Sequence, residues 1–471
     1  MVRRRARASN EATPPTTGRI RTALCRGGIK PHHGNVALID SGLSSRRAAL
    51  GILAAVQRGV PFDVALNRSL GGLPERDKRL AHELAAGVLR HSAVLDGVIA
   101  PFVARGIASV APALLDVLRV GAYQLRYLER VPAHAAVATG VALAREALGE
   151  RAGGFANAVL RRVSELGPEA PGDADTDMVT QLASAWSHPA WLVARWLARF
   201  GAADTATLLE WNNTHPALVV QPARGGSGDL ERLFHDEGVR SFSAPYGTGI
   251  VVEATRPERL PGFARGMFYV QDPAQAMVLR FADFPPDTLV YDACAAPGGK
   301  TLGLGRTASG VIAADASRRR LQRLRANLRR AGHGREFPVV ADALHPPIGM
   351  VAAYLLDAPC LGTGTFARHP DARLRVTPDA LRRLAGEQVR LLDAAADRVA
   401  PGGVLCYATC SLEPEEDASQ VGAFLARRPD FRRSPTDAIP PELLSTAGDL
   451  EVLPHRHGMD GAFAARLIRG E

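Results

Sequence analysis

The chain has 471 residues, of which 46% are hydrophobic and 22% are charged, and its formal net charge is +9. This length predicts two to four domains with separate cores, and the basic balance favours a polyanionic partner, most simply nucleic acid. No apolar run reaches the roughly 18 residues of a membrane span, and the five cysteines have no zinc-like spacing, so we expect reduced thiols, no metal site and a cytoplasmic protein.

Residues 1–42 are rich in Arg, Pro, Gly and Thr without periodicity, which predicts a disordered basic tail. From Ser44 onward, apolar residues recur at helical spacing and short breaks separate the blocks. We expect six helices in a bundle over 43–166, one starting near Ser44 and five over 75–91, 93–105, 110–128, 134–148 and 154–166. Helices with apolar faces of this kind favour an interaction module over a catalyst.

The middle of the chain predicts a linker followed by a small unit. Residues 167–179 are rich in Gly, Pro and Asp, as linkers are. Residues 180–285 predict a small α+β subdomain with a helix over 180–200, short strands, and a second helix over 228–237. Trp186, Trp191 and Trp196 lie five residues apart and are interpreted as packing residues.

After residue 285, strands and helices alternate, which predicts a doubly wound, Rossmann-like α/β domain over 286–471. The expected strands are 288–293, 310–315, 337–341, 351–357, 402–408, and a late pair at 451–454 and 462–467. The expected helices are 301–306, 317–331 and 376–398.

A glycine-rich turn joins the first of these strands to a helix, in Tyr291-Asp-Ala-Cys-Ala-Ala-Pro-Gly-Gly-Lys-Thr301. This arrangement is the usual ligand crevice of an open parallel sheet, and a tight turn without ligand is the alternative. A P-loop would need Gly six positions before the lysine, where this chain has Cys294, which argues against a nucleotide hydrolase. Only three of the 57 basic residues are lysines, so a compact ammonium group is expected to matter at Lys300.

Three of the predicted strands end in an acid, namely Asp315, Asp342 and Asp357. Asp315 follows Asp292 by 23 residues, about where the second strand of a nucleoside-binding sheet places a carboxylate on ribose hydroxyls. Each acid could instead cap a helix. Together, beside a glycine-rich turn, they favour a ligand site.

Two cysteines follow strand ends, Cys360 after Asp357-Ala-Pro and Cys410 after Ala408-Thr, whereas Cys406 fits a buried structural role. Neighbouring strands would present both thiols to one cleft. A thiolate that adds to C6 of cytosine makes C5 nucleophilic toward a methyl sulfonium, and a second group helps the adduct to collapse. An acid near N3 makes the addition easier.

Five pieces between residues 45 and 165 resemble the NusB-type RNA-binding bundle. They are Leu73-Pro-Glu-Arg-Asp-Lys-Arg-Leu-Ala-His-Glu-Leu, Gly87-Val-Leu-Arg, Gly121-Ala-Tyr-Gln-Leu, Val131-Pro-Ala-His-Ala-Ala-Val and Asn157-Ala-Val-Leu-Arg-Arg. The resemblance implies RNA contact. The candidates for phosphate contact are Arg76, Arg79, Arg90, Arg161 and Arg162, with solvated helix faces as the alternative.

Residues 180–471 resemble RNA (cytosine-5)-methyltransferases in Ala293-Cys-Ala-Ala-Pro-Gly-Gly-Lys-Thr, Asp357-Ala-Pro-Cys and Ala408-Thr-Cys-Ser. With a NusB-like bundle in front, the layout resembles the RsmB subgroup, which modifies 16S ribosomal RNA. Leu361 departs from that family, which more often has serine there, and His457-Gly-Met-Asp-Gly-Ala-Phe resembles its closing hairpin, for which we expect a structural role.

This resemblance implies a nucleophilic Cys410, a Cys360 that assists product release, and contacts from Lys300 and Asp357 to the cytosine. It also implies that S-adenosyl-L-methionine is bound by Cys294, Ala295, Ala296, Pro297, Gly298, Gly299, Lys300, Asp315, Asp342 and Asp357. The expected partner is 16S ribosomal RNA, bound by a monomer through the bundle and the small subdomain. The alternatives are the same chemistry on transfer RNA, or a non-catalytic NusB-like RNA-binding factor.

Overall fold

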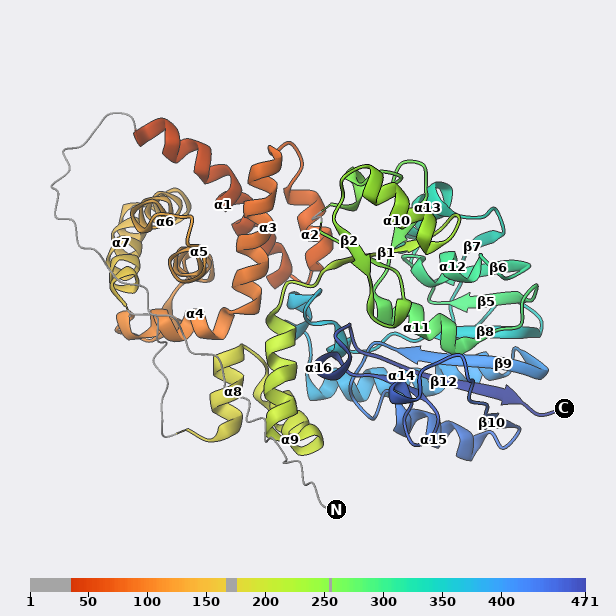
Figure 1. Cartoon of the computed structure of the whole chain (residues 1–471). Helices are drawn as coiled ribbons and strands as arrows, with labels where there is room; N and C mark the ends of the chain where they lie inside the picture. The colour runs from red at the N-terminus through yellow and green to blue at the C-terminus, as the bar shows by residue number, and fades with distance from the viewer. Residues whose placement is uncertain (1–34, 167–175, 254–255) are drawn as a thin grey trace, which may run out of the picture.

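The computed structural model describes residues 35–166, 176–253 and 256–471, with side chains from residue 42 onward. Figure 1 shows a helical bundle at one end, a large sheet with its helices at the other, and a small sheet between them. Within these described ranges, no helix combines the length and apolar character that a membrane crossing requires.

The described part of the bundle contains seven α-helices. They are α1 (Asn35–Gln57), α2 (Phe62–Ser69), α3 (Glu75–Arg90), α4 (Ser92–Ile99), α5 (Pro112–Tyr127), α6 (Ala133–Leu148) and α7 (Glu150–Glu165). The six expected helices are present, but α1 begins at Asn35, inside the expected tail; residues 1–34 of that tail lie outside the described residues. The short α2 was not predicted.

Two glycines in the NusB-like motifs allow the helices to approach closely. A Cβ atom on Gly87 would lie 2.0 Å from the Tyr123 ring, and one on Gly121 would lie 2.6 Å from Leu160. Leu160 is fully buried in the core of the bundle. A larger residue at either glycine would therefore push the helices apart.

The small sheet has the order β2-β3-β1-β4 and is antiparallel throughout. Its elements are β1 (Leu218–Pro222), α10 (Ser227–Asp236), β2 (Ser241–Ser243), β3 (Ile250–Val252) and β4 (Phe268–Val270). Its own core includes Val220, Phe234 and Phe268. This sheet and α10 match the α+β unit that was predicted.

Helices α8 (Met178–Trp186) and α9 (Ala190–Asn213) precede this sheet but pack elsewhere. Trp196 is 1% exposed and shares a core with Phe366 and Leu412, which lie in loops of the large sheet. The three tryptophans are packing residues, as predicted. The expected grouping of this helical pair with the small sheet differs from the packing observed.

The large sheet has eight strands in the order β10-β12-β9-β8-β5-β6-β7, with β11 paired to β12. The strands are β5 (Leu289–Ala293), β6 (Gly310–Asp315), β7 (Glu336–Val340), β8 (Val351–Asp357), β9 (Val399–Thr409), β10 (Phe431–Arg433), β11 (Leu450–Val452) and β12 (Ala462–Arg469). The helices are α11 (Pro273–Ala282), α12 (Gly299–Leu304), α13 (Arg318–Ala331), α14 (Pro378–Ala396), α15 (Ala418–Arg427) and α16 (Pro454–His457).

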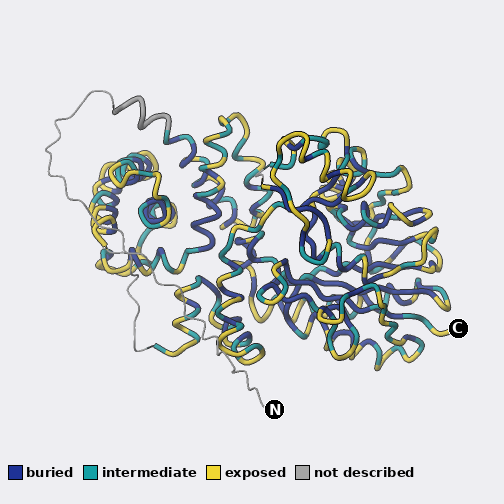
Figure 2. The backbone as a smooth tube through the Cα atoms, in the orientation of Figure 1, coloured by how far each residue is buried: buried dark blue, intermediate teal, exposed yellow. Residues whose placement is uncertain are grey.

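Five consecutive strands, β9-β8-β5-β6-β7, are parallel and β12 is antiparallel to β9, so the predicted doubly wound α/β domain is confirmed. Strands β5 and β8 in the middle are mostly buried, whereas the edge strand β7 has no fully buried residue (Figure 2). Register pairs Ala293 with Ala314 and Leu356, and Asp357 with Ala408. The glycine turn and the loops after β8 and β9 therefore meet at one edge of the sheet.

The loop that follows β8 also forms hydrogen bonds with the helical bundle. Arg90 Nη2 donates to the Ala367 carbonyl at 3.0 Å, Arg373 Nη1 donates to the Arg90 carbonyl at 3.1 Å, and the Phe62 N–H donates to Asp371 Oδ2 at 3.1 Å. Arg90 is only 4% exposed, so the prediction that it meets phosphate is wrong. Arg76, Arg79, Arg161 and Arg162 are exposed.

Candidate active site

The two predicted thiols meet at the ends of neighbouring strands. The Sγ atoms of Cys360 and Cys410 lie 3.4 Å apart, and the Cys410 N–H also donates to Cys360 Sγ at 3.4 Å. Both residues are partly exposed, whereas Cys406 is fully buried in β9, as its structural interpretation predicted. Gly362, with φ of 69°, turns the chain so closely past Cys410 that a Cβ atom would lie 3.7 Å from its sulfur.

The hydrogen bond that the Cys360 thiol shares with the Cys410 sulfur, together with burial, raises the pKa of Cys360 well above its ordinary value. The nearby Glu416 carboxyl, whose own pKa burial raises to about 7, adds to this effect. Cys360 is therefore a neutral S–H group at neutral pH. It can donate to a thiolate on Cys410 but does not compete with it as a nucleophile.

Lys300 lies beside the thiols and is almost fully buried. Its Nζ donates to Asp357 Oδ2 at 2.8 Å and to Gln275 Oε1. Burial lowers the pKa of the Lys300 ammonium, but the charge of Asp357 and its hydrogen bond outweigh burial, so the pKa is raised. A fixed, buried positive charge is thus held beside the thiols. Gln275, on α11, was not predicted, because its role depends only on packing against β5 and α12.

The glycine turn after β5 is closely packed. Cys294 has a φ of 61° and Gly298 a φ of 104°, both in the left-handed region. A Cβ atom on Gly298 would lie 3.3 Å from the Leu324 side chain of α13, and one on Gly299 would lie 3.2 Å from Gln271. Burial raises the pKa of Cys294 to about 12, so this third thiol stays neutral. Leu324 and Gln271 therefore leave little space for side chains at the two glycines that follow Cys294, Ala295, Ala296 and Pro297.

Buried carboxylates beside this turn have oxygens with no protein partner. Thr301 Oγ1 donates to Asp292 Oδ2 at 2.6 Å, and burial raises the pKa of Asp292 to about 7. Asp315 Oδ1 accepts from the Ser317 N–H at 2.7 Å. Among the described residues, Asp292 Oδ1 and Asp315 Oδ2 are buried without a partner. Such acceptors fit the hydroxyl and ammonium donors of a nucleoside ligand.

The third strand-end acid differs. Asp342 is exposed, and its Oδ1 accepts from the Leu344 N–H at 2.9 Å. No helix lies between Asp342 and β8 in the described chain, so this contact closes a turn and is not the helix cap that was the alternative. Asp342 stays a candidate for ligand contact only through its position after β7, at the same edge of the sheet.

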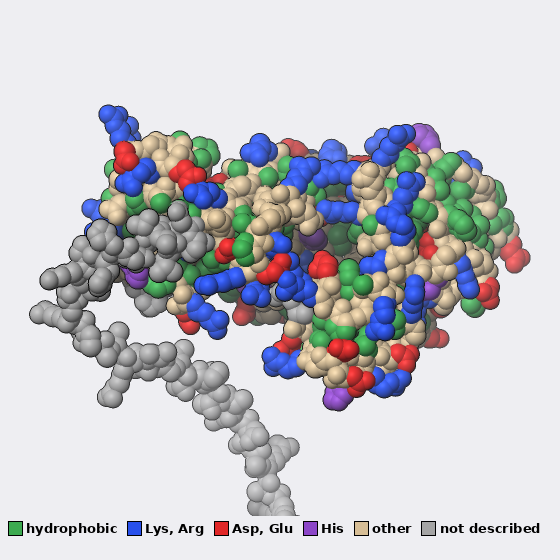
Figure 3. All heavy atoms as spheres, turned by 90° about the horizontal axis from the view of Figure 1, so that it is seen from above, with side chains coloured by type: hydrophobic (Ala, Val, Ile, Leu, Met, Phe, Trp, Pro, Cys, Tyr) green, Lys and Arg blue, Asp and Glu red, His purple; other side chains and the backbone are tan. Residues whose placement is uncertain are grey.

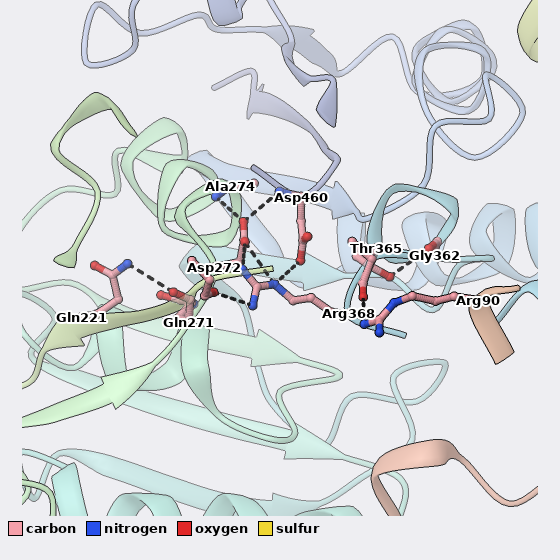
Figure 4. Close-up of polar contacts among 11 residues, drawn as sticks. Arg90, Gln221, Gln271, Asp272, Ala274, Gly362, Thr365, Arg368 and Asp460 are labelled. Atoms are coloured by element: carbon pink, nitrogen blue, oxygen red, sulfur yellow. Dashed lines mark hydrogen bonds and ion pairs between the residues drawn. The ribbon is translucent and has the colours of Figure 1, made fainter. Parts of the chain in front are cut away.

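Arg368 lies between Asp272 and Asp460 in a three-residue ion cluster, which we call the Arg368 clamp (Figure 4). Arg368 donates from Nη2 to Asp272 Oδ2 at 2.6 Å and from Nε to Asp460 Oδ2 at 2.8 Å. Both carboxylates are buried, and burial raises the pKa of Asp460 to about 7. Asp272 also accepts from the Ala274 N–H at 2.9 Å and so caps α11, the helix that carries Gln275.

The clamp connects to the thiols through main-chain hydrogen bonds. Gly461, next to Asp460, donates from its N–H to the Gly364 carbonyl at 2.8 Å, and the Gly364 N–H donates to the Cys410 carbonyl at 3.0 Å. The closing segment at 457–463 therefore has a second role besides pairing in the sheet. Its hydrogen bonds, through Gly364, fix the position of the Cys410 main chain. The sequence predicted only a structural role for the segment that contains Asp460, and it predicted no role for Arg368.

A central parallel sheet with a glycine-rich first turn and strand-end acids defines the class of S-adenosylmethionine-dependent methyltransferases, and comparisons with known proteins agree. The model of the 16S rRNA methyltransferase RsmB/F family matches residues 279–468, and the model of the NusB family matches residues 43–165. The chain belongs to the RsmB/F methyltransferase family, with a NusB-family domain in front.

Relatives match along almost the whole chain. A probable ribosomal RNA small subunit methyltransferase B from Synechocystis sp. is 33% identical over 443 residues, covering 90% of this chain and 99% of its own. The ribosomal RNA small subunit methyltransferase B of Pseudomonas putida is 34% identical over 442 residues, covering 91% and 99%.

Solved structures share the fold. The crystal structure of PH0851 superposes with a TM-score of 0.77 at 23% identity, covering 90% of this chain and 98% of its own. That of NSun6 from Pyrococcus horikoshii with SFG has a TM-score of 0.54 at 20% identity, covering 60% and 98%.

Proposed function

We propose that the protein methylates C5 of a cytosine in 16S ribosomal RNA, with Cys410 as the nucleophile that adds to C6. The observation that carries this proposal is the 3.4 Å pair of thiols beside the ion pair of Lys300 and Asp357. The choice of small-subunit RNA as the substrate rests on the names of the relatives and on the NusB-family domain.

The reaction needs the thiol because C5 of cytosine is a poor nucleophile. Addition of the Cys410 thiolate to C6 pushes electron density onto C5 and negative charge toward N3 and the carbonyl oxygen. Lys300, held by Asp357 and Gln275, places its ammonium where it can stabilise that charge. Asp357, whose side chain is 32% exposed beside Lys300, is the group that we propose orients the edge of the ring.

Cys360 acts when the adduct collapses. The methylated C5 gives up its proton to a water molecule, and the electrons of that C–H bond restore the double bond between C5 and C6. The bond between Cys410 and C6 then breaks, and Cys410 leaves as a thiolate. The neutral Cys360 S–H, 3.4 Å away, donates to that thiolate and so favours its expulsion.

The bound S-adenosylmethionine supplies an electrophilic methyl group. Asp315 has an unpartnered oxygen for ribose hydroxyls, and the close packing of Gly298 and Gly299 lets the main chain from Cys294 to Lys300 line the pocket. Asp342 completes the proposed set at the end of β7.

Three single-cysteine variants test the roles. Cys410→Ala should abolish methyl transfer from labelled S-adenosylmethionine to 16S RNA, whereas Cys360→Ala should accumulate a covalent protein–RNA adduct on denaturing gels. Cys406→Ala, which alters a thiol buried in the same strand, is the matched control and should keep most of the activity. Full activity in Cys410→Ala would refute the assignment.

Bisulfite sequencing of RNA from a deletion strain tests the substrate. One cytosine in 16S RNA should lose its protection and regain it on complementation. Loss of protection in transfer RNA alone would move the same chemistry to that substrate.

A further inference from the structure

A cavity of about 580 Å³ lies between the bundle and the small sheet, outside the active site. Its lining includes Arg79 from α3, Ala217 before β1, Phe242 from β2, and Arg256 and Arg259. The face seen in Figure 3 is hollowed between the bundle and the rest of the chain, and Lys and Arg side chains gather around the hollow.

The cavity holds more positive than negative charge. The Glu75 carboxylate is shared by three cations: Arg256 at 2.7 Å, Lys78 at 2.9 Å and Arg259 at 3.3 Å. Glu253 also lines the cavity and pairs with Arg240 at 2.6 Å. The lining therefore carries three arginines against two carboxylates and keeps a net positive charge. Within the described ranges, the Arg79 side chain forms no ion pair or hydrogen bond. This pattern suits a string of phosphates.

Phe242 supplies an aromatic face in the same cavity. It is the middle residue of β2, an edge strand of the small sheet, and 57% of it is exposed. A large apolar side chain that stays in water beside arginines is typical of proteins that stack an unpaired base. A protein partner would more often meet a wider apolar patch.

Both walls of the cavity are joined to the loop that carries Cys360. Arg368 Nη1 donates to the Ala217 carbonyl at 3.2 Å, on the side of the small sheet. On the other side, Arg90 at the end of α3 donates to the Ala367 carbonyl at 3.0 Å. A strand bound in the cavity is therefore held at a fixed position relative to the thiols.

We propose that this cavity binds an unpaired nucleotide of the substrate RNA that flanks the target cytosine. Phe242 stacks on its base, and Arg79, Arg256 and Arg259 contact the phosphates on either side. The proposal rests on the proposed function only in taking the substrate to be RNA.

Kinetics with the full chain and a 16S RNA fragment test the proposal. Phe242→Ala and the double variant Arg256→Gln/Arg259→Gln should each raise KM for RNA about tenfold and leave kcat at saturating RNA within about twofold. The double variant should also flatten the salt dependence of RNA binding, by about 1.4 in slope for two lost phosphate contacts. Phe337→Ala, which alters an aromatic that is 55% exposed on β7, and Arg232→Gln are the matched controls and should change neither quantity.

Photocrosslinking separates this proposal from the chemistry. With p-benzoylphenylalanine at position 242 in the Cys410→Ala background, the RNA fragment should crosslink even though no methyl is transferred. An unchanged KM in all cavity variants, or a crosslink to protein but not to RNA, would overturn the proposal. Neither outcome would affect the roles tested with the cysteine variants. A crosslink together with full activity of Cys410→Ala would support the cavity and reject the proposed nucleophile.

Discussion

The two halves of the active site are built in different ways. The proposed cofactor half is one continuous stretch, residues 291–301, with Asp315 from the next strand. Lys300 is the one residue of this stretch that we also assign to the thiol half, because it pairs with Asp357. The thiol half combines the loops after β8 and β9, the closing segment near Asp460, and the start of α11. Local conformation therefore controls the first half, whereas contacts between distant segments control the second. Variants should accordingly affect cofactor binding and base chemistry separately.

The largest effect should come from Lys300→Met. The variant removes the charge that faces the activated base and leaves Asp357 without its cation, so kcat should fall by about 10³. Arg383→Met, which alters an exposed cation paired with Glu387 on α14, is the control for loss of a positive charge. A kcat for Lys300→Met within tenfold of the parent would remove Lys300 from the proposed chemistry.

Arg368→Met should lower kcat by about 100-fold, although Arg368 does not touch the thiols. Its loss leaves two buried carboxylates uncompensated, which destabilises such sites by about 3–5 kcal/mol, and frees the segment that positions the Cys410 backbone. S-adenosylmethionine binding by calorimetry should stay within about threefold of the parent.

Arg368→Lys is the conservative variant and should restore part of kcat, because one ammonium can still bridge Asp272 and Asp460. If Arg368→Met weakens cofactor binding as strongly as catalysis, the two halves are not independent and the comparison fails.

Gly298→Ala should give the opposite result. A φ of 104° and a contact of 3.3 Å to Leu324 strain any side chain at this position, so cofactor affinity should fall about tenfold. The adduct that Cys360→Ala accumulates is read on denaturing gels as a function of cofactor concentration. When Gly298→Ala is added to Cys360→Ala, half-maximal adduct formation should need a higher cofactor concentration, but the maximal amount of adduct should be unchanged. Gly386→Ala, in open space on α14, is the matched control.

The same division explains what the sequence could predict. The strands β5 to β9, the glycine turn and both thiols follow from local patterns, because each depends on residues close in the chain. The apolar periodicity of α9 predicted burial of Trp196 but not its partners Phe366 and Leu412. Arg90 belongs to a helix that was predicted correctly, yet its burial depends on a loop that lies 277 residues further along the chain.

The smallest effect concerns the pH dependence of stability, and it isolates Asp292 of the cofactor half. Burial raises its pKa from 3.8 to about 7 in the folded chain, so the folded state holds a proton that the unfolded state has already lost. Its contribution to stability is complete below pH 3.8 and disappears as pH rises through 7, to a limit of roughly 4 kcal/mol. Without cofactor, Asp292→Asn should therefore show a shallower fall in Tm between pH 5 and pH 8 than the parent. Glu416, whose pKa burial also raises to about 7, remains in both proteins, so the difference between the two curves reports Asp292. Parallel curves would mean that Asp292 is already charged in the folded chain, and its oxygen would then be a stronger acceptor for the cofactor than burial alone implies.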